Sequence, residues 1–241
     1  SDDGTAIGAA FHCWHVELGK SERFAMKHAF WGPEYPDWRI LQAIEASGYD
    51  YHVCRSEEET LQMTADHIAD GAVLGWYQGR SEWGPRALGN RSILANPCIR
   101  NIKDTINLKI KKRESFRPFA PSVLREDVSK YFEQDIESPF MMHVVKFKPE
   151  WRDVFPAVVH ADGTGRLQSV DEDNNRLYYR LIKAVKARTG HGIVLNTSFN
   201  ENEPVVDTPE QAIACFDRTD MDELVLGKYL LTKSQMSAAA T

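Results

Sequence analysis

The sequence predicts an α/β fold in which a twisted mixed sheet is flanked by helices. Two observations predict this fold class. Short runs of apolar and β-branched residues, each about the length of one strand, occur along the chain. Segments with helix caps and apolar residues at helical spacing lie between these runs. Because the two kinds of segment do not follow a strict β-α-β order, we expect a mixed sheet.

Five helices are predicted from capping residues and from the spacing of apolar side chains. They cover residues 2–18, 37–47, 56–70 and 174–188, and a segment that begins at Thr208. Ser56 with Glu59, and Thr208 with Gln211, have the spacing of a capping box, in which two side chains satisfy free backbone N–H groups. A glycine follows each of the first three helices and is typical of a helix stop.

Seven strands are predicted from apolar or β-branched runs. They are residues 72–77, 92–95, 121–124, 141–147, 166–170, 193–196 and 224–226. The first two flank a segment rich in glycine and arginine, and the sixth ends in small polar residues. Polar residues at the carboxyl end of a strand are well placed to bind a ligand.

The bulk composition is that of a globular protein. Of 241 residues, 42% are hydrophobic and 27% are charged, and no apolar run is long enough for a transmembrane helix, so no membrane partner is expected. Cys13, Cys54, Cys98 and Cys215 are widely separated, which argues against structural zinc or a disulfide framework and suits a cytoplasmic location. Since the chain starts with Ser1 and has no secretory signal, we expect it to begin inside a longer protein.

The charge is unevenly distributed. The net charge is −6, yet the segment from Arg80 to Arg117 carries ten Lys and Arg residues against three Asp and Glu, a local balance of +7. A concentrated basic stretch in an acidic protein indicates a local anion site more than a nucleic-acid surface. A solvated helix face is the alternative for this stretch.

The densest functional signal is the segment at residues 79–91. Its three glycines allow close approach of the backbone to a ligand, and its three arginines supply planar donors for phosphate. Arg86 lies at its centre, within Gly-Pro-Arg-Ala-Leu-Gly. Taken alone, the segment also fits a purely structural turn.

A second basic segment follows at residues 109–121. Lys111 and Arg113 are two residues apart, so an extended backbone would place both side chains on one side. Arg117 is biased towards an extended conformation by Pro118. A solvated basic face is again the alternative.

Two shorter segments add polar residues next to predicted strands. Arg166 follows a glycine turn at the start of one strand, a few residues after His160. Ser198 and Asn200 follow the Val-Leu strand near residue 194 and are placed to hydrogen-bond a ligand. An Asx-type turn is the alternative for this last pair.

In combination, these segments resemble the carboxy-terminal domain of the carbamoyltransferase family, which includes nodulation-factor and antibiotic O-carbamoyltransferases. The resemblance covers about residues 70–232 and rests on Gly-Pro-Arg-Ala-Leu-Gly, Lys-x-Arg-Glu-x-Phe-Arg-Pro-Phe-Ala-Pro, Asp-Gly-Thr-x-Arg-Leu-Gln and Leu-Asn-Thr-Ser-Phe-Asn. The Lys111-x-Arg113 and Ser198-x-Asn200 pairs also resemble the nucleotide-site signature of YrdC-like proteins. Residues 2–8 are similar to the end of an ASKHA-type, Kae-like partner domain.

The resemblance implies a division of the chain. Residues 1–19 would be the end of the ASKHA/Kae-like domain and contain an amino-terminal helix, and residues 20–36 would be a connector. Residues 37–233 would form the YrdC-like domain, and residues 234–241 a tail.

The resemblance also implies an activity. The YrdC-like domain would bind ATP and carbamoyl phosphate and form carbamoyladenylate, and the amino-terminal ASKHA-like domain would pass the carbamoyl group to a hydroxyl of a small-molecule acceptor. Mg²⁺ would accompany ATP, and a further divalent metal would lie in the partner domain, where Asp2 would help to hold it.

By position, the family's ligand contacts fall on eight residues of this chain. Lys111, Arg117 and Arg166 would be catalytic, and the nucleotide and carbamoyl phosphate would also contact Arg86, Arg113, His160, Ser198 and Asn200. A structural role is the alternative for His160. Such a cationic set suits phosphoryl transfer, which needs positioning and charge more than a covalent partner.

Three other function classes are weighed against this one. A double-stranded RNA-binding module would use the same basic face, but the sequence pI near 5.8 and the few aromatics in the basic stretch count against nucleic acid. A catalytically inert domain kept for protein contacts does not explain the intact phosphate-type residues. No P-loop or dinucleotide-binding glycine motif occurs, and His12 with His15 lacks an acidic or cysteine partner for a metal.

Overall fold

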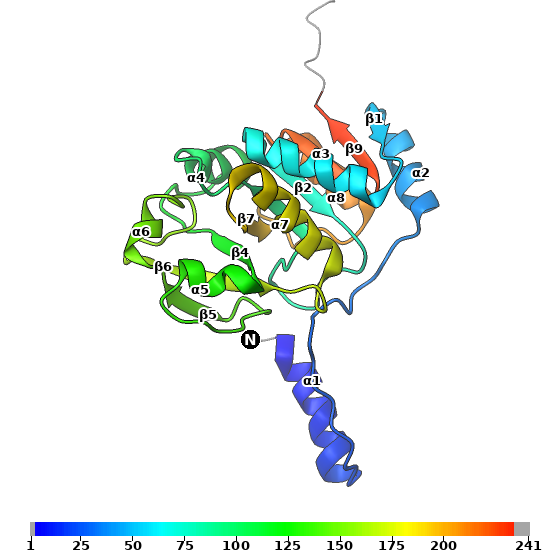
Figure 1. The fold of residues 1–241 in the computed structure, drawn as a ribbon. Helices are drawn as coiled ribbons and strands as arrows, with labels where there is room; N and C mark the ends of the chain where they lie inside the picture. Colours follow the sequence, from blue (N-terminus) through cyan, green and yellow to red (C-terminus); the bar gives the residue numbers. More distant parts are fainter. Residues whose placement is uncertain (1–2, 234–241) are drawn as a thin grey trace, which may run out of the picture.

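The computed structural model describes residues 3–233. Within this range nine strands form one sheet in the order β1-β9-β8-β2-β3-β7-β4-β6-β5 (Figure 1). Only the β2–β8 and β4–β6 pairs are parallel. The strands are β1 (Tyr51–Val53), β2 (Leu74–Tyr77), β3 (Arg91–Ala95), β4 (Ala120–Leu124), β5 (His143–Lys146), β6 (Thr164–Val170), β7 (Ile193–Ser198), β8 (Glu223–Leu226) and β9 (Tyr229–Thr232).

Helices of very different length connect these strands. The α-helices are α1 (Asp3–His12), α2 (Asp37–Ser47), α3 (Glu57–Asp70), α4 (Ile102–Thr105), α5 (Val128–Tyr131), α6 (Pro149–Arg152), α7 (Arg176–Thr189) and α8 (Pro209–Arg218). Two π-helical segments, η1 (Cys13–Glu17) and η2 (Ile106–Ile110), continue α1 and α4, and a 3₁₀ turn, η3 (Arg125–Asp127), precedes α5. No helix within residues 3–233 is long and apolar enough to cross a membrane.

Helical layers cover both faces of the sheet, because successive side chains of a strand point to opposite faces. Leu74, Leu94 and Val194 pack into one cluster with α3 and α7. Ile93 and Ile193 pack into the other cluster, with α2, α4 and α8. The central strands therefore read as apolar runs, since both of their faces are buried.

The predicted mixed α/β fold is confirmed, and each of the seven predicted strands is present with small shifts at the ends. Thr208 and Gln211 form the predicted capping box at α8. At α3, Ser56 accepts from the N–H of Glu59 as predicted, but the Glu59 carboxylate accepts from the N–H of Arg55 and not from that of Ser56. The box is thus formed only in part.

The sequence reading missed two strands at one edge of the sheet. β1 has only three residues, Tyr51, His52 and Val53, which are too few to show a strand pattern, and all three are exposed. β9 follows β8 through the two-residue turn Gly227-Lys228, and Gly227 has a φ of +57°. Glycine in a two-residue loop is typical of a β-hairpin, so β9 could have been predicted from the sequence.

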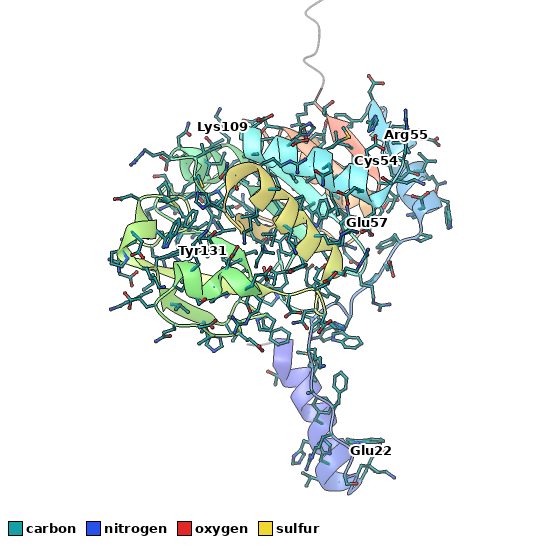
Figure 2. All side chains as sticks on the ribbon, viewed as in Figure 1. Glu22, Cys54, Arg55, Glu57, Lys109 and Tyr131 are labelled. Atoms are coloured by element: carbon teal, nitrogen blue, oxygen red, sulfur yellow. The ribbon has the colours of Figure 1, made fainter. Side chains whose placement is uncertain are left out.

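α1 and η1 project away from the globular body (Figure 1). No described side chain of either is buried, and Glu22 lies near their far end (Figure 2). The chain after η1 returns to the body through three backbone hydrogen bonds: from Gly32 N to Ser81 O (2.9 Å), from Ser81 N to Pro33 O (2.9 Å) and from Trp83 N to Ala29 O (2.6 Å). A Cβ at position 32 would lie 2.0 Å from Ser81 Oγ, so this pairing requires glycine.

Candidate functional site

Four arginines from three separate segments line one cavity of about 290 Å³. Arg86 comes from the loop between β2 and β3, Arg113 and Arg117 from the loop after η2, and Arg166 from β6. Ser198, at the end of β7, lines the same cavity. Five of the eight residues expected to contact the ligands therefore meet here.

The cavity is electropositive. Its lining contains no Asp or Glu, although Glu114 lies beside it and pairs with Arg117 Nε at 3.1 Å. Burial and the neighbouring Arg86 lower the pKa of Arg166, and burial and Arg117 lower the pKa of Arg113. Burial is the larger cause of both shifts, and the repulsion between the cations adds to it; an anion in the cavity would oppose both effects.

Lys111 lies behind the cavity and is 2% exposed. Its Nζ donates to Ser198 O (2.5 Å), Asn200 O (2.7 Å) and Asn200 Oδ1 (2.7 Å). Burial and Arg113 lower the pKa of Lys111 to about 7. In this structure the ammonium group anchors the end of β7, and direct contact of Lys111 with a ligand stays a prediction.

A second cavity of about 560 Å³ adjoins the first, and Pro85, Arg86 and Ser198 line both. Asn200 lines this larger cavity, together with Trp83 and a segment that ends at Asp207. The site therefore has a small arginine-lined compartment next to a larger one with apolar and polar walls.

A buried polar network holds the Arg86 loop against the sheet. Asn196 Nδ2 donates to Ala87 O (3.0 Å), and Gln168 Nε2 donates to Leu88 O (2.8 Å). Glu82 Oε1 accepts from the N–H groups of Leu88 (2.8 Å) and Asn90 (2.9 Å). Burial raises the pKa of Glu82. These interactions fix the backbone from which Arg86 reaches the cavities.

Sequence reasoning missed Glu82, Asn196 and Gln168, as well as the fully buried Asn107 of η2. Polar residues inside otherwise apolar strands were the available signal for Asn196 and Gln168, because a buried amide requires partners. No pattern in the sequence singles out Asn107 or Glu82.

His160 is not part of this cluster. The His160 Nδ1 atom lies 3.0 Å from Thr164 Oγ1, burial lowers the pKa of His160, and neither cavity includes it. Its contact with a ligand stays a prediction, beside its structural role in this turn. Asp2 lies outside the described residues.

The described part of the chain offers no ready-made metal centre: no group of three or more His, Cys, Asp or Glu side chains in residues 3–233 is arranged to hold an ion. The charged side chains that line the smaller cavity are all arginines, which suit phosphate groups and not a bare cation.

The mixed sheet flanked by helices is a YrdC-like α/β fold, and it carries the arginine-lined cavity. Sua5 from P. abyssi, solved in complex with L-threonine, is similar in fold, with a TM-score of 0.50 and 12% identity over 72% of this chain and 48% of that one. Residues 65–233 match the family model described as Carbamoyltransferase C-terminus. The chain belongs to this carbamoyltransferase family.

Two curated relatives illustrate the family. The Nodulation protein NolNO of Sinorhizobium fredii is 47% identical over 98% of this chain and 35% of its own length. The 3'-hydroxymethylcephem-O-carbamoyltransferase of Amycolatopsis lactamdurans is 31% identical over 94% of this chain and 41% of its own length. The chain thus spans less than half the length of either relative.

Proposed function

We propose that this chain uses ATP to convert carbamoyl phosphate into carbamoyladenylate, as the first half of O-carbamoyl transfer to a hydroxyl of a small-molecule acceptor. The single observation that carries the proposal is the convergence of Arg86, Arg113, Arg117 and Arg166 on one small cavity. Membership of the carbamoyltransferase family supplies the chemistry that such an anion site would serve.

The arginines answer an electrostatic problem. ATP and carbamoyl phosphate are both polyanions, and each pair of like charges about 4 Å apart costs ~4 kcal/mol at an effective dielectric constant near 20. A neutral hydrogen bond contributes only about 1 kcal/mol, so neutral donors cannot offset several such terms. Four guanidinium groups can, and each presents planar donors that match phosphate oxygens.

The proposed chemistry needs no protein nucleophile. Water cleaves carbamoyl phosphate into carbamate and phosphate, and a carbamate oxygen then attacks the α-phosphorus of ATP and displaces pyrophosphate. The chain's residues act on charge and position: Arg166 and Arg113 neutralise phosphoryl oxygens, and Ser198 donates a hydrogen bond. Arg86 lines both cavities and is placed to hold the phosphates where they pass from one to the other.

The larger cavity is the proposed place of the nucleoside. Its volume of about 560 Å³ lies in the range of small-molecule pockets, and Trp83 adds an aromatic wall. Mg²⁺ would enter bound to the phosphates of ATP, because no group of three or more acidic, His or Cys side chains within residues 3–233 is arranged to hold it beforehand.

The hydroxyl acceptor would bind a separate amino-terminal domain. Trp14 on the projecting helix is 39% exposed, and Leu18 and Phe24, which follow the helix, are each 57% exposed. Burying apolar side chains against a neighbouring domain is favourable, so this arm is the proposed contact with the ASKHA-like domain. The further metal, with Asp2 as one ligand, would belong to that domain, and the whole protein would act in the cytoplasm.

The isolated chain should form carbamoyladenylate and should not carbamoylate any acceptor. Both cavities lie within the described residues, whereas the acceptor site would lie in the other domain. Adenylation itself should be slow, because an open site loses electrostatic strength to water. Mass spectrometry of the chain with ATP, Mg²⁺ and carbamoyl phosphate, with and without an acceptor such as a hydroxymethyl cephem, tests this. Carbamoylated acceptor formed by the chain alone would overturn the division of labour.

The dissociation constant for duplex RNA should be above about 1 µM at physiological salt. The reason is that the arginines line a cavity of about 290 Å³ and do not form an open basic face. Filter binding with a 20-base-pair duplex measures this. Tight binding that the R113A variant abolishes would favour the RNA-binding alternative.

A further inference from the structure

Asn107 is a buried amide whose side-chain hydrogen bonds all go to the basic loop, which we define as residues 111–117. It is 0% exposed. Its Nδ2 donates to Ser115 O (3.2 Å) and to Arg117 O (2.9 Å), and its Oδ1 accepts from Arg113 Nε (2.8 Å). One buried side chain thus hydrogen-bonds to the backbone at Ser115 and Arg117 and to the guanidinium group of Arg113.

The backbone around Asn107 brings the loop over it. Lys111 N donates to Ile106 O (2.8 Å), which closes the π-helical turn of η2. Lys112 then adopts a φ of +44°, which is uncommon for a residue with a Cβ. This step reverses the chain, so that Arg113 N donates to Asn107 O (2.9 Å). Single π turns often occur at functional sites.

Asn107 also determines which atoms of Arg113 remain for a ligand. The bond to Asn107 uses Nε, and the guanidinium carbon lies 5.1 Å from the centre of the Phe119 ring. Within residues 3–233 the two terminal nitrogens of Arg113 make no hydrogen bond, so they are available to a ligand in the arginine cavity that Arg113 lines. The plane of its guanidinium group is therefore held from behind.

We infer that Asn107 is a positioning residue for the anion site, and this inference rests on the proposed function. It holds Arg113 and the backbone of Arg117 so that both guanidinium groups meet phosphate oxygens of the nucleotide or of pyrophosphate in one arrangement. Side chains that are fixed before the ligand arrives lose less entropy on binding. Second-layer hydrogen bonds of this kind decide whether a site is accurate or too loose.

The test is a double-mutant cycle read out as the dissociation constant of inorganic pyrophosphate, measured by calorimetry on the whole chain. R113A should weaken binding at least tenfold, and N107A should weaken it about tenfold, because the arginine loses its anchor. The double variant should bind no more than about threefold more weakly than R113A, since without Arg113 the asparagine keeps only its hold on the backbone at Ser115 and Arg117. A purely structural asparagine would instead give losses that multiply.

Two further variants keep the outcome decisive. N107D preserves the shape and accepts from Arg113, but it cannot donate to the carbonyls of Ser115 and Arg117. It should therefore also bind pyrophosphate more weakly. If N107A does not fold, N107D takes its place in the test. N96A removes a buried amide that bonds only to Cys98 N and Ala69 O, and it should bind within about twofold of the unchanged chain.

The outcomes separate the two hypotheses. If the unchanged chain does not bind pyrophosphate, the proposed function fails and this inference fails with it. If the unchanged chain binds while N107A and N107D bind equally well, or if the losses of N107A and R113A multiply, the positioning role of Asn107 is wrong and the anion site stands.

Discussion

R166A should lower the rate of carbamoyl-phosphate-dependent ATP–pyrophosphate exchange by about two to three orders of magnitude. Removing one preorganised donor to a developing charge typically costs about 3–4 kcal/mol of transition-state stabilisation. Arg166 is half-buried near the start of β6 and lines the arginine cavity. Because burial already disfavours its charge, its contribution to an anion should exceed that of an exposed arginine.

The matched control for this experiment is R176A. Arg176 lies at the start of α7 and pairs with Glu57 at 3.0 Å, at the surface and outside both cavities. Exposed ion pairs contribute about 0–1 kcal/mol, so this variant should keep its exchange rate. An exchange rate for R166A within threefold of that of R176A would remove Arg166 from the site.

K111M should lower both the free energy of unfolding and the exchange rate. The change leaves the buried oxygens of Ser198 and Asn200 without the donor that Lys111 supplies. Unpaired buried polar groups cost about 1–3 kcal/mol each, so we expect a loss of about 3 kcal/mol of stability. The exchange rate should fall about a hundredfold, because the end of β7 carries Ser198 into the cavity.

K109M is the control for K111M on the same segment, since Lys109 is exposed at the surface of the molecule (Figure 2). Chemical denaturation with the exchange assay measures both effects. If K111M matches K109M in stability and in rate, Lys111 anchors nothing of consequence.

The same lysine predicts how stability depends on pH. The pKa of Lys111 is lowered to about 7 in the folded chain, whereas a lysine in the unfolded chain titrates near 10.4. Between these values the unfolded state binds more protons than the folded state, so the unfolding free energy of the unchanged chain relative to K111M should rise as the pH rises from 7 to 10. Pyrophosphate affinity should fall over the same range, because the positive charge is lost.

The neighbouring groups do not obscure this titration. Arg113, Cys215 and Glu203 are the other charged or titratable groups that act on Lys111. The pKa of Cys215 is raised to about 12, mainly by burial, and the pKa of Glu203 is lowered, so neither titrates between 7 and 10. A stability difference that is flat over this range would show that Lys111 keeps its proton.

The sequence alone determined the fold class, seven of the strands and the segments from which the site is built. These features are local: apolar runs, capping residues and glycine-flanked arginines are written in contiguous residues. The edge strand β1 was not predicted because three residues are too few to show an apolar pattern.

Only the tertiary structure decided which cations face the ligand cavity. Three arginines share the segment at residues 79–91, yet only Arg86 lines the arginine cavity. Arg91 is 0% exposed, with its guanidinium carbon 3.6 Å from the centre of the Tyr77 ring, and Arg80 donates to Trp31 O. Because Arg80, Arg86 and Arg91 have the same side chain, the sequence alone does not distinguish which of them lines the cavity.

The same holds for Lys111 and for Asn107, which sequence reasoning did not single out. Whether a side chain meets the ligand or supports the residue that does depends on the packing of η2 near β7, which lies far from it in the chain. Local residue patterns identify groups that can bind an anion. Burial and the exact direction of each side chain, which arise when distant segments pack, decide which of those groups do so.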